Sequence, residues 1–137
     1  TLAWIQRLQA SYERCEDFAW GVTQKDSGQI IGVCTLWNFD PSFHCAEIGY
    51  ELNPLYQKQG IMSEAISAVL TFGFTTLGLH RIEANPSAEN MASINLLRKF
   101  GFKQEGILRE RIYFRGRLDD QMYFGLLRDE WLYPSNT

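Results

Sequence analysis

The chain has 137 residues, of which 45% are hydrophobic and 21% are charged, and its net charge at pH 7 is −3. This length suffices for one folded domain with its own core, and the weak negative charge argues against a nucleic-acid-binding surface. No apolar run is long enough to cross a membrane. Three cysteines at irregular spacing give no disulfide framework, so we expect a cytoplasmic protein.

The first half of the chain is predicted to contain one helix and three strands. Apolar residues at helical spacing predict an amphipathic helix over residues 2–15. Alternating apolar residues on both sides of a turn at residues 25–28 predict a β-hairpin over residues 18–37. A loop over residues 38–42 then leads to a further strand over residues 45–52.

The second half is predicted to contain two helices and three strands. One apolar stripe predicts a helix over residues 62–77, which Gly78 ends. A short strand over residues 81–84 precedes a second helix over about residues 90–100. A final hairpin covers residues 107–127. This order of elements predicts an α/β domain in which helices pack on a mixed sheet.

The segment from Asn53 to Ala65 carries the clearest functional signal. It joins a strand to a helix through a short polar turn that contains Lys58 and Gly60. The first turn of a helix has unpaired N–H groups and a partial positive charge, and a glycine lets a ligand approach the main chain. The segment therefore predicts a binding site for a phosphorylated small molecule. Only two histidines occur, without metal-ligand spacing, so we expect no metal site.

Four segments in a fixed order resemble one known family. They are Gln57-Lys58-Gln59-Gly60-Ile61-Met62, residues 78–84, residues 90–97 and residues 100–109. The first is similar to motif A of the GNAT superfamily of acyl-CoA-dependent N-acetyltransferases, Gln/Arg-x-x-Gly-x-Gly/Ala, with Met62 in place of the last small residue. The whole series resembles the RimJ/RimL-type branch, which acetylates N-terminal amines of ribosomal proteins and includes relatives with other amine substrates.

The resemblance covers nearly the whole chain and implies a fold. It implies a mixed, mostly antiparallel sheet with helices on both faces. The family begins with a strand and a helix that precede the segment seen in this chain. The expectation is therefore a single GNAT domain over residues 1–137 that is N-terminally incomplete relative to the family.

The resemblance also implies acetyl-CoA as the donor, with a binding site built from main-chain and side-chain groups. The pyrophosphate would lie on the turn that comprises Gln57, Lys58, Gln59, Gly60, Ile61, Met62 and Ser63. The pantetheine arm would run along the strand that carries Tyr50 and Leu52, like an added strand. Asn85 and Asn90 offer amides at the opposite wall. Asn90 is equally explained as the N-cap of its helix.

The resemblance suggests Glu47 and Ser93 as the catalytic residues. Glu47 lies where an acidic residue often acts as the base in the family, although a solvent-facing strand carboxylate explains it as well. Glu51 shares the face of Glu47 by period-two spacing and is the fallback. Glu110 lies near a position that bears a carboxylate in some relatives, but the residue two positions further on is Ile112 here. Ser93 matches the residue proposed to protonate the leaving thiolate.

The predicted function is acetyl transfer to a primary amine, directly in a ternary complex, because no activated nucleophile is visible. The acceptor is expected to be a protein N-terminal α-amine. Two alternatives stay open, namely a small-molecule amine such as a polyamine, amino acid or aminoglycoside, and an acyl-CoA-binding regulatory module without turnover. Arg109 and Arg111 could contact an acidic partner or a second subunit, which leaves a homodimer open.

Overall fold

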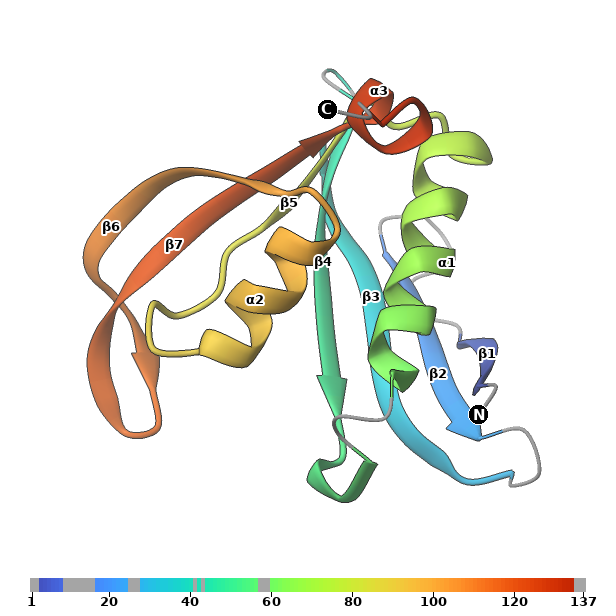
Figure 1. Ribbon diagram of the computed structural model, residues 1–137, viewed down its shortest axis with the longest axis horizontal. Helices are drawn as coiled ribbons and strands as arrows, with labels where there is room; N and C mark the ends of the chain where they lie inside the picture. The colour runs from blue at the N-terminus through green and yellow to red at the C-terminus, as the bar shows by residue number, and fades with distance from the viewer. Residues whose placement is uncertain are drawn as a thin grey trace.

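The computed structural model describes residues 3–8, 17–24, 28–40, 42, 44–56 and 60–134, with only the backbone described for 3–8 and 24. The strands form one seven-stranded sheet in the order β1-β2-β3-β4-β5-β7-β6 (Figure 1). Every neighbouring pair is antiparallel except β4 and β5, which are parallel. The prediction of a mixed, mostly antiparallel sheet is therefore confirmed.

The bounds of the elements follow the sequence pattern closely after the first strand. The strands are β1 (Ala3–Leu8), β2 (Phe18–Gln24), β3 (Ile30–Asp40), β4 (Cys45–Leu52), β5 (Arg81–Ala84), β6 (Lys103–Phe114) and β7 (Arg117–Leu127). The α-helices are α1 (Ile61–Thr75), α2 (Met91–Lys99) and α3 (Arg128–Leu132), and a 3-10 turn, η1, covers Pro54–Tyr56. None of the described helices is long and apolar enough to span a membrane.

The core lies between one face of the sheet and the helices α1 and α2. Alternate residues of the central strands, such as Leu36, Ile48 and Ile82, are buried against the apolar stripe of α1. The hydroxyl groups of Tyr50 on this face and of Ser93 on α2 contact each other, so α2 covers the same face as α1. The resemblance implies helices on both faces, whereas all helices in the described part of the chain lie on this one (Figure 1).

The prediction of a helix over residues 2–15 is wrong at its beginning. Residues 3–8 form β1, which pairs with residues 19–24 along the edge of β2. The outer edge of β2 would otherwise present a row of unpaired N–H and C=O groups. Strand pairing satisfies these groups, and this long-range gain overrides a helical pattern that rests on few residues. Residues 9–16 lie outside the described residues.

The predicted loop over residues 38–42 begins later than expected. Strand β3 continues to Asp40 through an irregularity between Trp37 and Asp40, where Asn38 adopts a left-handed conformation with a φ of 54°. Asparagine tolerates this conformation better than most residues. Such a bulge turns a side chain away from the regular alternation of a strand, and the Asn38 side chain acts to lower the pKa of Glu47 on the neighbouring strand β4.

The C-terminal part adds one element that the sequence pattern did not predict. Helix α3 places Trp131 against the ring of Phe100, at 5.9 Å between centroids, and its indole N–H donates to the Thr71 hydroxyl at 3.2 Å. These contacts fasten the ends of α1 and α2 to each other. Ile94 on α2 is buried as expected, whereas Met91, which was predicted to face inward, is 52% exposed.

Candidate active site

The sheet divides between its two parallel strands. Strands β4 and β5 pair only from Cys45 to Glu47, and the last pair is Glu47 with Glu83. Beyond it β4 continues to Leu52, while β5 ends at Ala84 and turns away with β7 (Figure 1). We call this divergence the fork. It opens the sheet at its centre, with α2 lying over one face of the opening.

Backbone groups of β4 point into the fork. The Asn53 N–H, just after β4, donates to the Ile31 carbonyl of β3 at 2.7 Å. The backbone groups of the odd-numbered residues in β4 therefore bond to β3. In an antiparallel ladder the intervening residues point to the other side. The N–H and C=O groups of Tyr50 and Leu52 therefore face the side from which β5 has diverged. An extended ligand could add there as a strand does.

Helix α1 begins after the C-terminal end of β4, and its first turn has the geometry of an anion-binding site. Gly60 has a φ of 75°, and no atom among the described residues lies within 4 Å of the position that a Cβ would occupy. The first hydrogen bond of the helix runs from the Glu64 N–H to the Gly60 carbonyl. The N–H groups of Ile61, Met62 and Ser63 accordingly have no partner inside the described helix. These groups fit the diphosphate of a coenzyme.

The remaining residues of the predicted phosphate turn divide into two groups. Gln57, Lys58 and Gln59 lie outside the described residues. Ile61 and Met62 are buried in the core, at 1% and 8% exposure, so any contact with an anion would come from their backbone N–H groups. The assignment of residues 57–63 to coenzyme binding stays a prediction.

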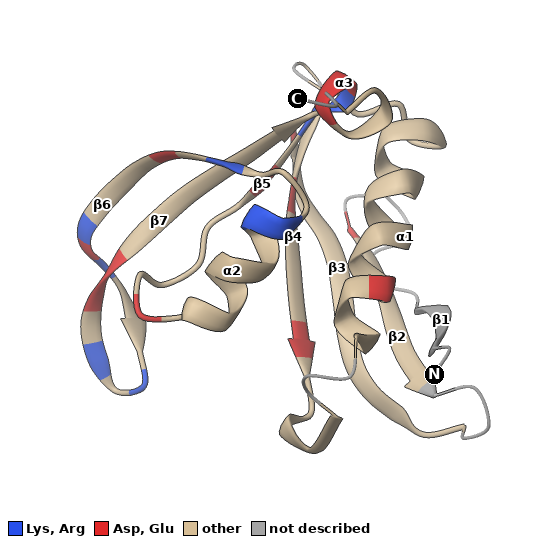
Figure 2. Ribbon diagram, viewed as in Figure 1, with Lys and Arg blue, Asp and Glu red and all other residues tan. Residues whose placement is uncertain are grey.

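A cation that the sequence pattern did not reveal lies beside this turn. The Lys99 ammonium group donates to the Ser63 hydroxyl at 3.4 Å. Lys99 belongs to the basic last turn of α2, which Figure 2 shows in blue. Lys99 is 36 residues away from Ser63 in the sequence, so no local pattern predicts that they are close. Their proximity results from the packing of α2 beside α1.

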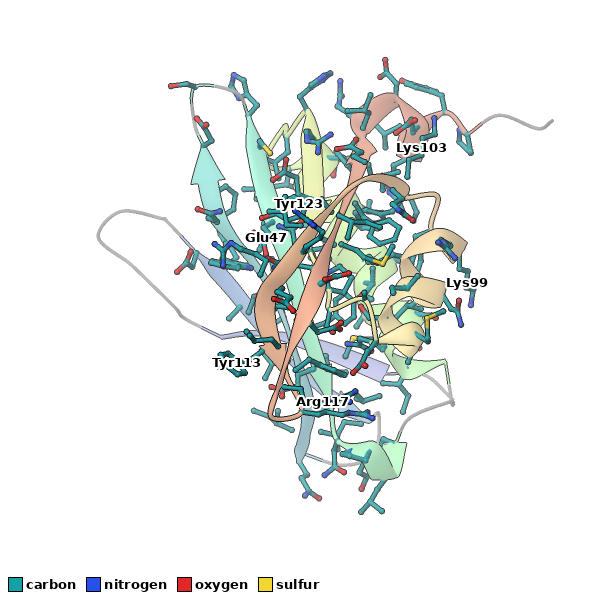
Figure 3. The ribbon with its side chains drawn as sticks, turned by 90° about the vertical axis from the view of Figure 1, so that its left-hand side faces the viewer. Glu47, Lys99, Lys103, Tyr113, Arg117 and Tyr123 are labelled. Carbon is teal, nitrogen blue, oxygen red and sulfur yellow. The ribbon has the colours of Figure 1, made fainter. Side chains whose placement is uncertain are left out.

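Glu47 occupies the last paired position before the fork, on the sheet face away from the helices. Its neighbours Ala46 and Ile48 point into the core, so Glu47 points the opposite way, and Figure 3 shows it across the sheet from Lys99 on α2. Burial raises the pKa of the Glu47 carboxyl, and the negative charge of Glu83 acts in the same direction. Hydrogen bonds from the side chains of Asn38 and Asn85 oppose this rise.

The two other candidate bases have fewer features of a catalytic carboxylate. Glu51 lies on the same strand as Glu47 and is exposed. Glu110 lies in an irregular part of β6 between Leu108 and Ile112, two strands away from β5, and has a φ of 49°. Side chains do not alternate regularly between the two faces of the sheet in this part of β6. Residues two positions apart, such as Arg109 and Arg111, therefore need not lie on the same face of the sheet. Glu47 is the candidate that lies at the fork, and its role as base stays a prediction.

Ser93 lies on the helix-covered side of the fork and pairs with Tyr50. The two hydroxyl oxygens are 2.5 Å apart, and either group can be the donor. Burial raises the pKa of the Tyr50 phenol to about 12, which the hydrogen bond to Ser93 opposes. Tyr50 therefore keeps its proton at neutral pH. The sequence pattern predicted a backbone role for Tyr50 and did not reveal this hydroxyl pair, because the two residues are 43 positions apart.

Asn90 caps helix α2, as one of its two explanations predicted. Its side-chain oxygen accepts a hydrogen bond from the Ser93 N–H at 3.3 Å. Asn85 lies nearer the fork, immediately after β5, and its side chain acts to lower the pKa of Glu47. The two asparagines thus serve different local purposes, and a contact of either with coenzyme A stays a prediction.

We expect Asn90→Ala to lower the free energy of unfolding by about 1 kcal/mol, because the Ser93 N–H loses its side-chain partner. Urea denaturation measures this change, and Asn90→Asp, which can still cap, is the matched control. If Asn90 also binds the coenzyme, Asn90→Ala weakens CoA binding in calorimetry at a temperature where both proteins are folded. Unchanged CoA affinity would restrict Asn90 to capping.

A pocket of about 650 Å³ adjoins the Glu47 side of the fork. Its lining residues come from the ends of β3, β4 and β5 and are Asn38, Phe39, Asp40, Cys45, His80, Arg81 and Glu83. The Arg81 guanidinium binds Glu83 at 2.8 Å and both carboxylate oxygens of Glu105 at 2.5 and 2.9 Å. This arginine is therefore occupied by two carboxylates, and the pocket keeps an excess of negative charge.

The fork brings together the parts that acyl transfer requires. A half-buried carboxylate lies on one face, a pair of hydroxyl groups lies on the other, and an open strand edge leads to a helix N-terminus. No group of three or more His, Cys, Asp or Glu side chains that could hold a metal occurs in the part of the chain that the structure describes. Fold and site together define a transferase of the type that acts on acyl thioesters and amines.

Comparisons with known proteins identify the family. The model of the acetyltransferase (GNAT) domain matches residues 1–103. The chain is 35% identical over 127 residues to the uncharacterized N-acetyltransferase YoaA of Bacillus subtilis (strain 168), covering 93% of this chain and 72% of YoaA. The chain therefore belongs to the GNAT family of acyl-CoA-dependent N-acetyltransferases.

Two further relatives have named acceptors. The chain is 32% identical over 115 residues to the ribosomal protein uS5-alanine N-acetyltransferase of Escherichia coli (strain K12), covering 83% of this chain and 59% of that enzyme. The crystal structure of the spermidine/spermine N-acetyltransferase SpeG from Vibrio cholerae matches with a TM-score of 0.83 and 26% identity, covering 90% of this chain and 72% of that one. The chain thus spans less than two thirds of the length of the Escherichia coli enzyme.

Proposed function

We propose that this chain transfers an acetyl group from acetyl-CoA to a primary amine, directly in a ternary complex. The observation that carries the proposal is the fork, because it places Glu47 on one face of the sheet and the Tyr50–Ser93 pair on the other. The edge of β4 that faces the fork and the first turn of α1 would hold the pantetheine arm and the diphosphate. Tyr50 and Leu52 contribute backbone groups to the former, and residues 60–63 to the latter.

In this proposal the bound coenzyme supplies an acetyl thioester, whose carbonyl carbon the amine nitrogen attacks as the carbon–sulfur bond breaks. Glu47 accepts the proton that the amine loses. Ser93 donates a proton to the departing sulfur and recovers one from the Tyr50 hydroxyl through their hydrogen bond. The raised pKa keeps Tyr50 protonated at neutral pH, and after the transfer Tyr50 regains its proton from solvent, to which Glu47 releases the proton of the amine.

A protein N-terminal α-amine is the preferred acceptor. An α-amine with a pKa near ~7.8 is about one-tenth neutral at pH 7, so deprotonation costs roughly 1 kcal/mol. A lysine ε-amine with a pKa near ~10.4 costs roughly 4 to 5 kcal/mol at the same pH. One carboxylate of raised pKa such as Glu47 suffices for the first case. The similarity to the uS5-alanine acetyltransferase supports the same choice.

The pocket supports a small polycationic amine as the second candidate. Asp40 and Glu83 line it, and its one lining arginine is occupied by Glu83 and Glu105. A second positive charge on the acceptor would be stabilised by this excess of carboxylates. The similarity to a spermidine acetyltransferase is consistent with that choice.

Release of CoA thiol from acetyl-CoA distinguishes the two candidates. We expect a peptide that begins with alanine to support release with a kcat/KM at least tenfold above that for spermidine. The same peptide with an acetylated N-terminus and one internal lysine is the control, and it should not support release. A reversed order would favour the small amine. Tight CoA binding without thiol release for any amine would indicate a regulatory module and refute the proposal.

A further inference from the structure

We propose that Trp37 binds the acceptor, through contact between the face of its indole ring and the ammonium form of the amine beside Glu47. This inference rests on the proposed function for the presence of an amine acceptor, and it adds a residue that determines how tightly this amine binds. Trp37 is 43% exposed, although it is the largest side chain of β3. Its ring is therefore accessible to a ligand.

The register of the sheet places Trp37 next to Glu47. The two residues are paired in the antiparallel ladder of β3 and β4. Directly opposite residues in such a ladder lie on the same face, with Cβ atoms about 4.5–5.5 Å apart. The adjoining residues Leu36 and Ile48 are buried in the core, so Trp37 and Glu47 both lie on the face away from the helices. The indole thus shares the face from which Glu47 would accept the proton.

Gly49 makes room for the indole ring at the fork. A Cβ at Gly49 would lie 3.5 Å from the indole Nε1 of Trp37, so the ring lies over this glycine and a larger side chain would displace it. Gly49 does not have a positive φ, so its backbone conformation does not require a glycine. Glycine weakens the interior of a strand and often marks a close approach of another group. Gly49 lies two residues beyond the last pair of β4 and β5, which places the ring beside the opening.

The charges on this face favour a cation as the occupant. Glu83 on β5 lies opposite Glu47, and Glu51 follows on the same face of β4. The guanidinium of Arg81, on this face of β5, is bound by Glu83 and Glu105. The face of an indole ring attracts cations more strongly than the other aromatic side chains do. Three carboxylates and an accessible indole together fit an ammonium group.

Binding of the ammonium form matches the chemistry of the acceptor. An α-amine is about nine-tenths protonated at pH 7, so the enzyme meets mainly the ammonium form. After Glu47 has taken one proton, the nitrogen becomes positive again as it attacks the thioester carbon. The ring therefore stabilises the bound substrate and the transition state alike. Loss of an interaction that both states share raises KM and leaves kcat nearly unchanged.

Steady-state kinetics with acetyl-CoA and an alanine-starting peptide test the inference. Trp37→Leu removes the ring, and we expect it to raise the KM for the peptide at least about fivefold while kcat changes less than about twofold. Trp37→Phe keeps an aromatic face of weaker attraction, so its KM should lie between the two. Alaninamide, which keeps the α-amine and lacks the rest of the peptide, should show the same rise. A rise for the peptide alone would overturn contact with the ammonium group.

Tryptophan fluorescence measures binding of the amine without turnover. In the presence of CoA, which has no acetyl group to transfer, the peptide can bind but cannot react. Adding the peptide should change the emission of the unchanged chain but not that of Trp37→Phe. Trp131→Phe is the matched control, because it removes an indole that packs against Phe100 among the helices, and it should keep the change. The peptide with an acetylated N-terminus should have no effect on any of the three proteins.

The two measurements separate this inference from the proposed function. An unaltered KM in Trp37→Leu, or an emission change that persists in Trp37→Phe, would overturn the role of Trp37 while acetyl transfer stands. A peptide that leaves the emission of the unchanged chain unaltered would overturn it as well. Amine binding that depends on Trp37, without thiol release for any amine, would instead refute the proposed function and leave the role of Trp37 in amine binding standing.

Discussion

Gly60→Glu is expected to abolish CoA binding, with an affinity in calorimetry at least about 100-fold below that of the unchanged chain. The space beside Gly60 is open among the described residues, so a carboxylate would enter the position proposed for the diphosphate. Repulsion between the two anions at close range would exceed 2 to 3 kcal/mol, which corresponds to about 100-fold. The left-handed φ of 75° adds strain for any side chain.

Gly78→Glu is the matched control for this result. Gly78 follows the other end of α1 and has a φ of 67°, and no atom of the described residues lies within 4 Å of the position that its Cβ would occupy. The change adds the same charge and comparable strain, but it lies far from the first turn of the helix. A carboxylate is less favourable at the C-terminal end of a helix than at the N-terminal end. Loss of CoA binding in Gly60→Glu alone therefore cannot reflect instability, and equal affinities would refute the phosphate site.

Glu47→Gln is expected to lower kcat/KM by about 10²- to 10⁴-fold, the range that general bases contribute. The loss should be largest at low pH, where the amine is protonated and depends on a proton acceptor, and it should diminish as the amine becomes neutral. Burial raises the pKa of Glu47 above its ordinary value, so the acid limb of the unchanged enzyme should lie above that value. A pH–rate profile with the alanine-starting peptide measures both features.

The raised pKa of Glu47 also predicts the effect of this substitution on stability. The folded state binds the Glu47 proton more tightly than the unfolded state does. Stability is therefore lost as the pH rises from the unfolded pKa through the folded one. Glu47→Gln removes this loss, so its unfolding free energy at pH 7 should be equal or higher. Glu51→Gln tests Glu51, the alternative candidate base. Loss of the acid limb of the pH–rate profile in that variant would make Glu51 the base.

Local patterns predicted the elements from β2 to β7, although β3 ends later and β6 begins earlier than expected. The strands at Cys45–Leu52 and Arg81–Ala84 have the expected limits, and α2 lies between the expected cap Asn90 and Phe100. These elements carry alternation or helical spacing over their whole length, and their end signals are local. Helix α1 was also predictable from local sequence, because the glycine turn before it and its apolar stripe are adjacent in the sequence.

Other features depended on partners that are distant in the sequence. Strand β1 formed because the edge of β2 was there to pair with it. The exposure of Met91 and the burial of Ile94 on the same helix depend on where α2 packs, not on their apolar character. The position of Asn38 results from a bulge in β3 that appears only in the register between β3 and β4.

The amino-acid sequence by itself indicated the family, the succession of elements from β2 to β7 and the glycine turn before α1, because each of these is written in contiguous residues. The tertiary structure decided which groups meet at the fork. Glu47 lies opposite Glu83 at the last pair of β4 and β5, and beyond this point the Tyr50 hydroxyl meets the Ser93 hydroxyl of α2. On its other side β5 pairs with β7, a long-range contact that no local pattern encodes.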